Sequence, residues 1–307
     1  MKFRTEYEAH PSSSGLRLQP CSPILFLGSC FSDNIGMRLK EMSMPVTVNP
    51  CGVLYNPASI ANILHMAIDG EDPLLHENGN LADADGNPLH FSWDFSTRFS
   101  RHNRRDAAAA IAEGLEMVRE ALQKEAVLAV TFGTSIIYSL SESIPENLCD
   151  SRVTEGYGRV VGNCHKFPAA YFTRRAMSVE SIVAMWERLI AGLHEAFPCL
   201  KVIATVSPVR HLAEGFAANA RSKARLLLAC GMLEEKGLLT YFPAYEIMND
   251  DLRDYRFYAD DLLHPSPQGV EYILEKFTAT FMDEKARQAL RLAEKAYRRS
   301  QHHPIIK

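Results

Sequence analysis

The chain has 307 residues, 47% of them hydrophobic and 23% charged, and its 33 basic side chains against 37 acidic ones leave a formal net charge of −4. This apolar content excludes a disordered or collagen-like chain, and the length suffices for one large domain or two small ones with a sizeable core. The mild acidity and the lack of basic clusters argue against a nucleic-acid-binding protein, because neutralising phosphates needs grouped lysines and arginines.

No window of the sequence approaches 18 uninterrupted apolar residues, and the polar first twenty residues lack the apolar core of a secretory signal. We therefore expect a cytoplasmic protein with no membrane partner. The seven cysteines are scattered and form no CxxC pair, a pattern typical of neither a disulfide framework nor a zinc site. We expect most of them to be buried thiols, and we expect no metal or other cofactor.

Apolar runs of strand length alternate along the chain with segments of helical period, and this pattern predicts a parallel α/β sheet. The first half is predicted to contain strands at 24–27, 45–48 and 127–132 and helices at 33–41, 57–68 and 106–124. After an apolar run at 136–140, the second half is predicted to contain strands at 201–206 and 239–242 and helices beginning at Ser178 and covering 214–236, 266–282 and 283–299.

Two stretches interrupt this pattern. Residues 70–104 interleave aromatic and polar residues, which indicates either an excursion that packs its aromatics onto the domain or a segment that covers a substrate. Residues 141–175 are rich in Gly, Pro, Asn and Arg, and a long irregular stretch of this kind is more often functional or mobile than idle. We find no repeat or linker, so we predict a single domain over 1–307 with its core at about 20–282 and a helix and tail at 283–307.

In open parallel sheets, sites form at the carboxyl ends of the strands. At the first strand end, the run Gly28-Ser29-Cys30 places a small nucleophile before a helix. A helix N-terminus lowers a thiol pKa, and its free amides can bind an oxyanion. The plainer interpretation is a strand-to-helix turn in which Cys30 is buried and Ser32 or Asp33 caps the helix.

A second motif lies near the C-terminus, where Asp261 and His264 stand three residues apart just before a predicted helix. A carboxylate in this relation can accept a hydrogen bond from the imidazole and orient it, which leaves the other ring nitrogen free to act as a general base. The Asp-x-x-His spacing alone is weak, but it becomes strong when it is paired with the nucleophile turn.

Together the two motifs resemble the SGNH/GDSL hydrolase superfamily, and within it the GSCFA family, whose name-giving run stands here as Gly28-Ser29-Cys30-Phe31-Ser32. Further segments similar to that family are 49–57, 131–134, 163–166, 207–211 and 241–258. The resemblance implies a three-layer α/β/α sandwich around a five-stranded parallel sheet of the flavodoxin-like order. It also implies hydrolysis of an ester bond.

The resemblance assigns roles to individual residues. Cys30 occupies the nucleophile position, Ser29 is its rival after a slip of one residue, and His264 and Asp261 complete the catalytic set. Gly52 fits the glycine of the oxyanion hole. The asparagine expected after the third strand is absent from Gly133-Thr134-Ser135, so Ser135, Thr134 or Asn163 is expected to replace it.

Two further pairs of polar residues, His165 with Lys166 and Arg210 with His211, follow apolar segments. They are either surface or capping groups or the recognition site for an anionic or hydroxyl-rich substrate. Because relatives of the superfamily act on lipids, acylated sugars and thioesters, we expect a small-molecule or saccharide ester as substrate, with a carbohydrate ester favoured by analogy. An acyltransferase using the same residues and a non-catalytic carbohydrate-binding module are the alternatives, and the oligomeric state is left open.

Overall fold

A computed structural model describes residues 6–10, 15–70, 73–124, 127–213 and 215–301. The expected tail beyond 301 and the first residue of the helix predicted at 214–236 lie outside the described residues. The helices are α1 Cys30–Glu41, α2 Pro57–Asp69, α3 Arg104–Gln123, α4 Val179–Ala196, α5 Phe216–Glu235, α6 Ala244–Glu246, α7 Pro267–Phe281 and α8 Glu284–Gln301. The strands are β1 Ile24–Gly28, β2 Val46–Val48, β3 His76–Asn78, β4 Leu89–Phe91, β5 Val127–Phe132, β6 Ile136–Leu140, β7 Val160–Val161, β8 Phe172–Ala176, β9 Lys201–Val206 and β10 Thr240–Tyr241.

The main sheet has five strands in the order β10-β9-β5-β1-β2, and every neighbouring pair is parallel. Counting only these strands in chain order, the arrangement is 2-1-3-4-5, which is the flavodoxin-like order. Both features of the predicted sheet are therefore confirmed. The carboxyl ends of all five strands lie at one edge, which brings the segments after each strand together.

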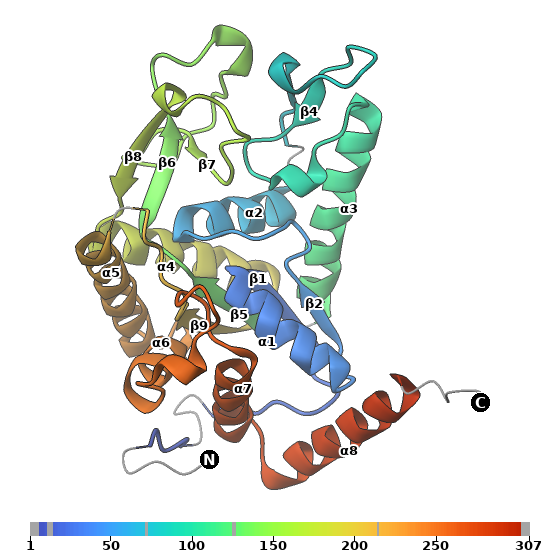
Figure 1. Cartoon of the computed structure of the whole chain (residues 1–307), viewed down its shortest axis with the longest axis vertical. Coiled ribbons are helices and arrows are strands. Elements are labelled where there is room, and N and C mark those ends of the chain that lie inside the picture. Colours follow the sequence, from blue (N-terminus) through green and yellow to red (C-terminus); the bar gives the residue numbers. More distant parts are fainter. Residues whose placement is uncertain (1–5, 11–14, 71–72, 125–126, 214, 302–307) are drawn as a thin grey trace.

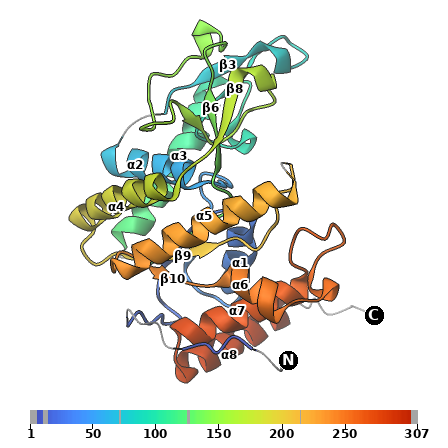
Figure 2. The same cartoon turned by 90° about the vertical axis from the view of Figure 1, so that its left-hand side faces the viewer.

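Helices cover both faces of this sheet. The side chains of Leu25 and Leu27 point into one core, which α2, α3, α4 and α5 complete, whereas Ile24 and Phe26 point into the other, which α1, α7 and α8 complete. This alternation follows from the two-residue period of a strand, and the unbroken apolar run of β1 reflects burial on both faces. Figure 2 shows the sheet between the two helical layers. The predicted three-layer sandwich is thus confirmed.

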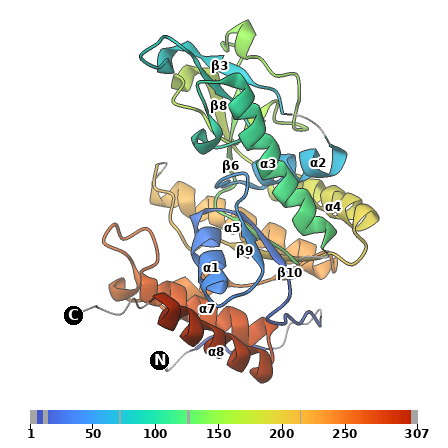
Figure 3. The same cartoon turned by 90° about the vertical axis from the view of Figure 1, so that its right-hand side faces the viewer.

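The two stretches that interrupt the pattern form small sheets beyond α2 and α3, at the top of Figure 1. Strands β3 and β4 make an antiparallel pair within 70–104. Strand β6 lies between β7 and β8 in a three-stranded antiparallel sheet, to which 141–175 contributes β7 and nearly all of β8. Most of 141–175 consists of turns and irregular segments, as expected, and β7 and β8 are the exceptions. Figure 3 shows α3 extending from these small sheets to the main sheet.

The aromatic side chains of 70–104 are buried in two places, Phe91 and Trp93 among residues of the small sheets and Phe95 and Phe99 in the core of the main sheet. Phe91, Trp93, Phe95 and Phe99 are all at most 6% exposed. Phe91 and Trp93 pack edge to face with ring centroids 4.7 Å apart, a favoured aromatic geometry. This burial agrees with the interpretation that the stretch packs its aromatics inward. Among the described residues, no helix is long and apolar enough to cross a bilayer.

Candidate active site

A cavity of about 520 Å³ opens where β1, β5 and β9 end. Its lining combines the start of α1, the segment before α2, the segments that follow β5 and β9, the end of β7 and the loop before α7. Six residues that the sequence suggested for the site line it together, namely Cys30, Thr134, Asn163, Arg210, His211 and His264. The fold thus gathers residues that are up to 234 positions apart in the sequence.

Asp261 orients His264 within a tight turn. One carboxylate oxygen of Asp261 accepts hydrogen bonds from the amides of Leu263 and His264 at 2.8 and 3.0 Å, and the other lies 2.6 Å from His264 Nδ1. Bonds from the His264 and Leu263 amides, followed by the imidazole, lower the pKa of Asp261 to about 2. The ionised carboxylate can only accept, so Nδ1 carries the proton and Nε2 is left as a base.

Cys30 is the first residue of α1, and its side chain is half-buried at the cavity wall. Burial is the main cause that raises the thiol pKa above its usual value, and the carboxylate of Asp33 adds to the effect. The amides of Cys30 and Phe31 act in the opposite direction but are outweighed. The amides at the helix terminus thus lower this pKa as expected, but the net shift is upward, so a thiolate at this position needs a base to form.

The cysteines as a group are less buried than expected. Only Cys51 and Cys230 are buried, whereas Cys21, Cys149 and Cys199 are exposed because they lie in short turns outside the strands and helices. The expectation that most of them are buried thiols was wrong.

Ser29 does not line the cavity. Its side chain is fully buried, and it caps α1 by accepting a hydrogen bond from the Phe31 amide at 3.4 Å. The plainer interpretation of the turn expected Ser32 or Asp33 to cap this helix, and that expectation was wrong because Ser29 is the cap. Ser32 instead donates to the Thr131 hydroxyl at 2.7 Å, which ties α1 to β5.

The structure does not bring Gly52 and Ser135 to the cavity. The Gly52 amide donates to Asn49 O at 2.8 Å within a turn, so it is not free to donate to an oxyanion. Ser135 is fully buried, and both its amide and its hydroxyl lie within hydrogen-bond distance of the Ser222 hydroxyl on α5. Thr134 lines the cavity, but its hydroxyl lies 3.0 Å from the same Ser222 oxygen.

Arg210 and His211 are tied to the neighbouring loops. The Arg210 guanidinium donates to the Tyr258 hydroxyl at 3.2 Å, and its amide donates to Leu263 O at 3.3 Å beside His264. His211 packs edge to face with Tyr55, and burial, followed by the charges of Lys223 and His264, lowers its pKa to about 4. His211 is therefore neutral at pH 7, whereas Arg210 is a cation that supports the His264 loop.

His165 lies away from the cavity, although its neighbour Cys164 lines it. The imidazole is only 1% exposed, its Nε2 lies 2.9 Å from Ser92 O, and it packs against the rings of Phe91 and Trp93. Burial lowers its pKa to about 4. This packing makes His165 part of the aromatic core rather than a group that can recognise a substrate.

Sequence reasoning missed two polar residues near the cavity. Asn56 lines it directly as the N-cap of α2, whereas the sequence placed it in the family-like segment 49–57 without a role of its own. Lys223 is fully buried on α5, and its ammonium donates to Gly133 O and Ser207 O, both at 2.6 Å. The helical period offered a signal for it, because Lys223 falls on the face that Leu226, Cys230 and Leu233 bury.

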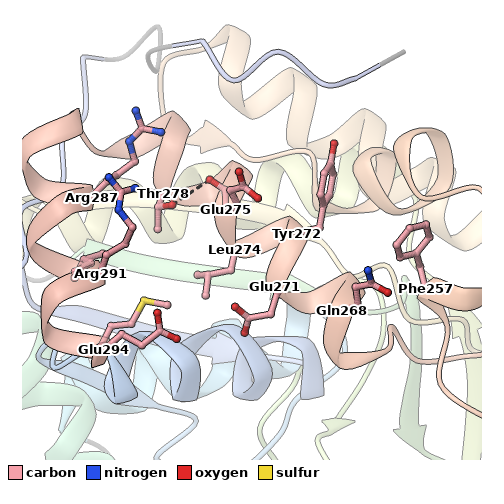
Figure 4. A pocket seen from close by; sticks show the side chains of 12 residues that line it. Phe257, Gln268, Glu271, Tyr272, Leu274, Glu275, Thr278, Arg287, Arg291 and Glu294 are labelled. Atoms are coloured by element: carbon pink, nitrogen blue, oxygen red, sulfur yellow. Dashed lines mark hydrogen bonds between the residues drawn. The ribbon is translucent and has the colours of Figure 1, made fainter. Parts of the chain in front are cut away.

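A second cavity of about 450 Å³ lies between α7 and α8 (Figure 4). Its walls carry acidic and basic side chains, among them Glu271, Glu294 and Arg291, and none of the residues predicted for the site. Within the described part of the chain, no group of three or more His, Cys, Asp or Glu side chains is arranged to hold a metal ion.

Comparison with known proteins matches residues 23–277 to the GSCFA family. No curated protein matches the chain. A solved structure that resembles it is a carbohydrate esterase of family 3 from Talaromyces cellulolyticus, with a TM-score of 0.37 and 8% sequence identity over 89% of this chain and 99% of that one.

Proposed function

This chain belongs to the GSCFA family, and we propose that it is an ester hydrolase in which Cys30 is the nucleophile and His264 is the general base. One observation carries the proposal: Cys30, at the N-terminus of α1, shares a cavity with an imidazole that Asp261 orients through a 2.6 Å contact. A nucleophile, a base and a group that orients the base are the components of acyl transfer.

The reaction proceeds in two balanced steps. His264 Nε2 takes the thiol proton, Cys30 Sγ bonds to the ester carbonyl carbon, and the carbonyl electron pair moves to oxygen. When this intermediate collapses, the C–O bond to the alcohol breaks and His264 returns the proton to the leaving alkoxide. Water then attacks the thioester while His264 accepts its proton, the C–S bond breaks, and the departing sulfur takes that proton back.

The position of Ser29 supports Cys30 over Ser29 as nucleophile. A hydroxyl that is fully buried and caps the helix cannot reach a substrate in the cavity without breaking the cap. The raised thiol pKa of Cys30 also fits a nucleophile that is activated by His264 rather than one that is permanently ionised.

The cavity walls indicate how an ester would lie. Apolar residues line the cavity from three places. They are Ile136 and Val161 of the small sheet, Val209 and Leu212 after β9, and Leu263 in the loop before α7. We propose that this wall holds the acyl group, because apolar surface is removed from water when such a group binds there. The carbohydrate alcohol expected by analogy remains a prediction.

Hydrolysis of p-nitrophenyl acetate tests the proposal. We expect Cys30→Ala to abolish turnover and Ser29→Ala to keep it while losing about 1 kcal/mol of stability with its cap. Acid quenching during turnover should leave an acetyl group on the peptide that contains Cys30. The exposed Cys199 provides the control variant, Cys199→Ala, which should behave as wild type.

Three results would contradict this assignment. They are an inactive wild-type protein, an acetyl group trapped on Cys164 of the same cavity, or loss of turnover in Ser29→Ala with retention in Cys30→Ala.

A further inference from the structure

The segment that precedes α2 is bound across the ends of the two central strands. The Leu54 amide donates to Gly28 O at 2.9 Å, at the end of β1. The amides of Gly133 and Thr134, directly after β5, both donate to Tyr55 O, at 2.7 and 2.9 Å. Asn56 follows at once, so its backbone is held beside the turn that carries Cys30.

The side chain of Asn56 has a defined orientation. Its Oδ1 accepts a hydrogen bond from the Ser59 amide at 2.8 Å as the N-cap of α2. Only the carbonyl end of a carboxamide can accept from an amide, so the NH₂ group must be at the other end. Asn56 is 6% exposed and lines the cavity with Cys30. Within the described part of the chain its Nδ2 makes no hydrogen bond, and it is not among the polar atoms sealed from solvent without a partner.

Two of the groups expected to complete the oxyanion hole are used elsewhere. The Gly52 amide is bonded within its own turn, and the Ser135 hydroxyl is directed at α5. Asn163 also lines the cavity, with its Oδ1 accepting from the His165 amide and, among the described residues, no partner for its NH₂ group, but its backbone amide is bonded to Trp93 O, away from the main sheet. Asn56 differs from Asn163 in its backbone support, because it directly follows the two residues that are bonded to the ends of β1 and β5.

We propose that Asn56 is a catalytic residue that supplies the side-chain donor of the oxyanion hole, in the place of the asparagine that is missing after β5. The inference rests on the proposed function. When Cys30 Sγ bonds to the carbonyl carbon, negative charge develops on the carbonyl oxygen. The Asn56 NH₂ group and the Cys30 amide, which as the first helical amide has no partner within α1, donate to that oxygen. The cap bond to Ser59 holds the carboxamide in place before the reaction, so no reorganisation is needed.

The substitution Asn56→Ser removes the NH₂ donor but keeps a side-chain oxygen that can cap α2, so it tests the two roles of Asn56 separately. A serine hydroxyl still accepts from the Ser59 amide, and Ser and Asn are nearly equivalent at an N-cap. Its shorter side chain leaves the NH₂ position empty. With p-nitrophenyl acetate as the probe, we expect kcat to fall by about 10²–10³-fold while KM changes little and the melting temperature stays within a few degrees of wild type. Asn56→Asp, which keeps the acceptor and adds a negative charge, should be slower still.

The matched control is Asn103→Ser on α3. Asn103 caps that helix in the same way, accepting from the amides of Arg105 and Asp106 at 2.8 and 3.2 Å, but it is exposed and does not line the cavity. This variant should keep wild-type kcat.

The inference is overturned if Asn56→Ser keeps more than a tenth of kcat, or if only Asn163→Ser shows the large loss. If either result is found while hydrolysis still depends on Cys30, the proposed function stands and only the role of Asn56 is lost. If the wild-type protein does not hydrolyse the ester at all, both the proposed function and the role of Asn56 are overturned.

Discussion

Asp261 shows how a half-exposed residue can be held in one charge state. Its carboxylate meets two backbone amides and one imidazole within 3.0 Å, and the turn that arranges them has Leu262 at a positive φ of 58°. These bonds stabilise the ionised form and lower the pKa to about 2. The charge therefore persists over the whole pH range in which a histidine titrates, and it keeps the proton of His264 on Nδ1.

We predict that Asp261→Asn reduces kcat by about 10³–10⁴-fold. The Asn oxygen can still accept from the two amides, but its NH₂ group then faces Nδ1 and forces the proton of the imidazole onto Nε2, so the base is lost. The measurement is the pH profile of kcat for p-nitrophenyl acetate. A variant that keeps a tenth or more of wild-type kcat would show that Asp261 does not set the tautomer of His264.

At the scale of elements, Lys223 links α5 to two strands of the main sheet. Its ammonium bonds to Gly133 O and Ser207 O, the carbonyls directly after β5 and β9, and both segments lead into residues that line the cavity. Burial lowers the pKa of Lys223 to about 7. The lysine therefore holds two loops of the site at a fixed separation, although it does not line the cavity itself.

We predict that Lys223→Met lowers the free energy of unfolding by about 2–4 kcal/mol, because methionine fills the space but leaves two buried carbonyls without donors. We also expect kcat to fall, since the loops after β5 and β9 lose their common partner. Urea unfolding at pH 7 measures the first effect. Arg221→Met, at an exposed position on the same helix, is the control and should change stability by less than about 0.5 kcal/mol. Equal stability of the two variants would contradict the role of Lys223.

The elements themselves were largely predictable. The five strands of the main sheet and the long helices follow from apolar runs and helical period. The helices expected to start at Ser178 and Ser266 are α4 and α7, and each serine is the N-cap. The strands β7 and β8 were missed. β7 has only two residues, and β8 is rich in exposed polar residues. Neither therefore shows the alternation of apolar and polar residues by which a strand is recognised in a sequence.

At the scale of the whole molecule, burial keeps several histidines neutral. His165 in the aromatic core and His211 at the cavity both have pKa values lowered to about 4, with burial as the main cause, and burial also lowers the pKa of His76. In the unfolded chain each would titrate near 6.5. Between pH 6.5 and pH 4 the unfolded state therefore binds more protons than the folded state. The free energy of unfolding must fall as the pH drops through this range.

We predict that His165 alone accounts for about 2 kcal/mol of the stability lost between pH 7 and pH 5. His165→Asn removes the titration and tolerates the positive φ of 47° at this position. Urea unfolding at the two pH values should show a smaller loss for this variant than for wild type. If both lose the same amount, His165 is not neutral in the folded protein for the reason given.

The amino-acid sequence by itself determined the parallel sheet, the helices that cover it, and the two motifs that contain Cys30 and His264, because these depend on periodicity and on local residue order. Only the tertiary structure decided which polar groups reach the cavity. Gly52 and Asn56 stand in the same family-like segment, yet the Gly52 amide is bonded within its own turn whereas Asn56 lines the cavity. Ser135 and His165 were likewise expected at the site, but their hydrogen bonds and burial turn them away from it. The direction of a side chain depends on partners far away in the sequence, and those partners meet only in the folded chain.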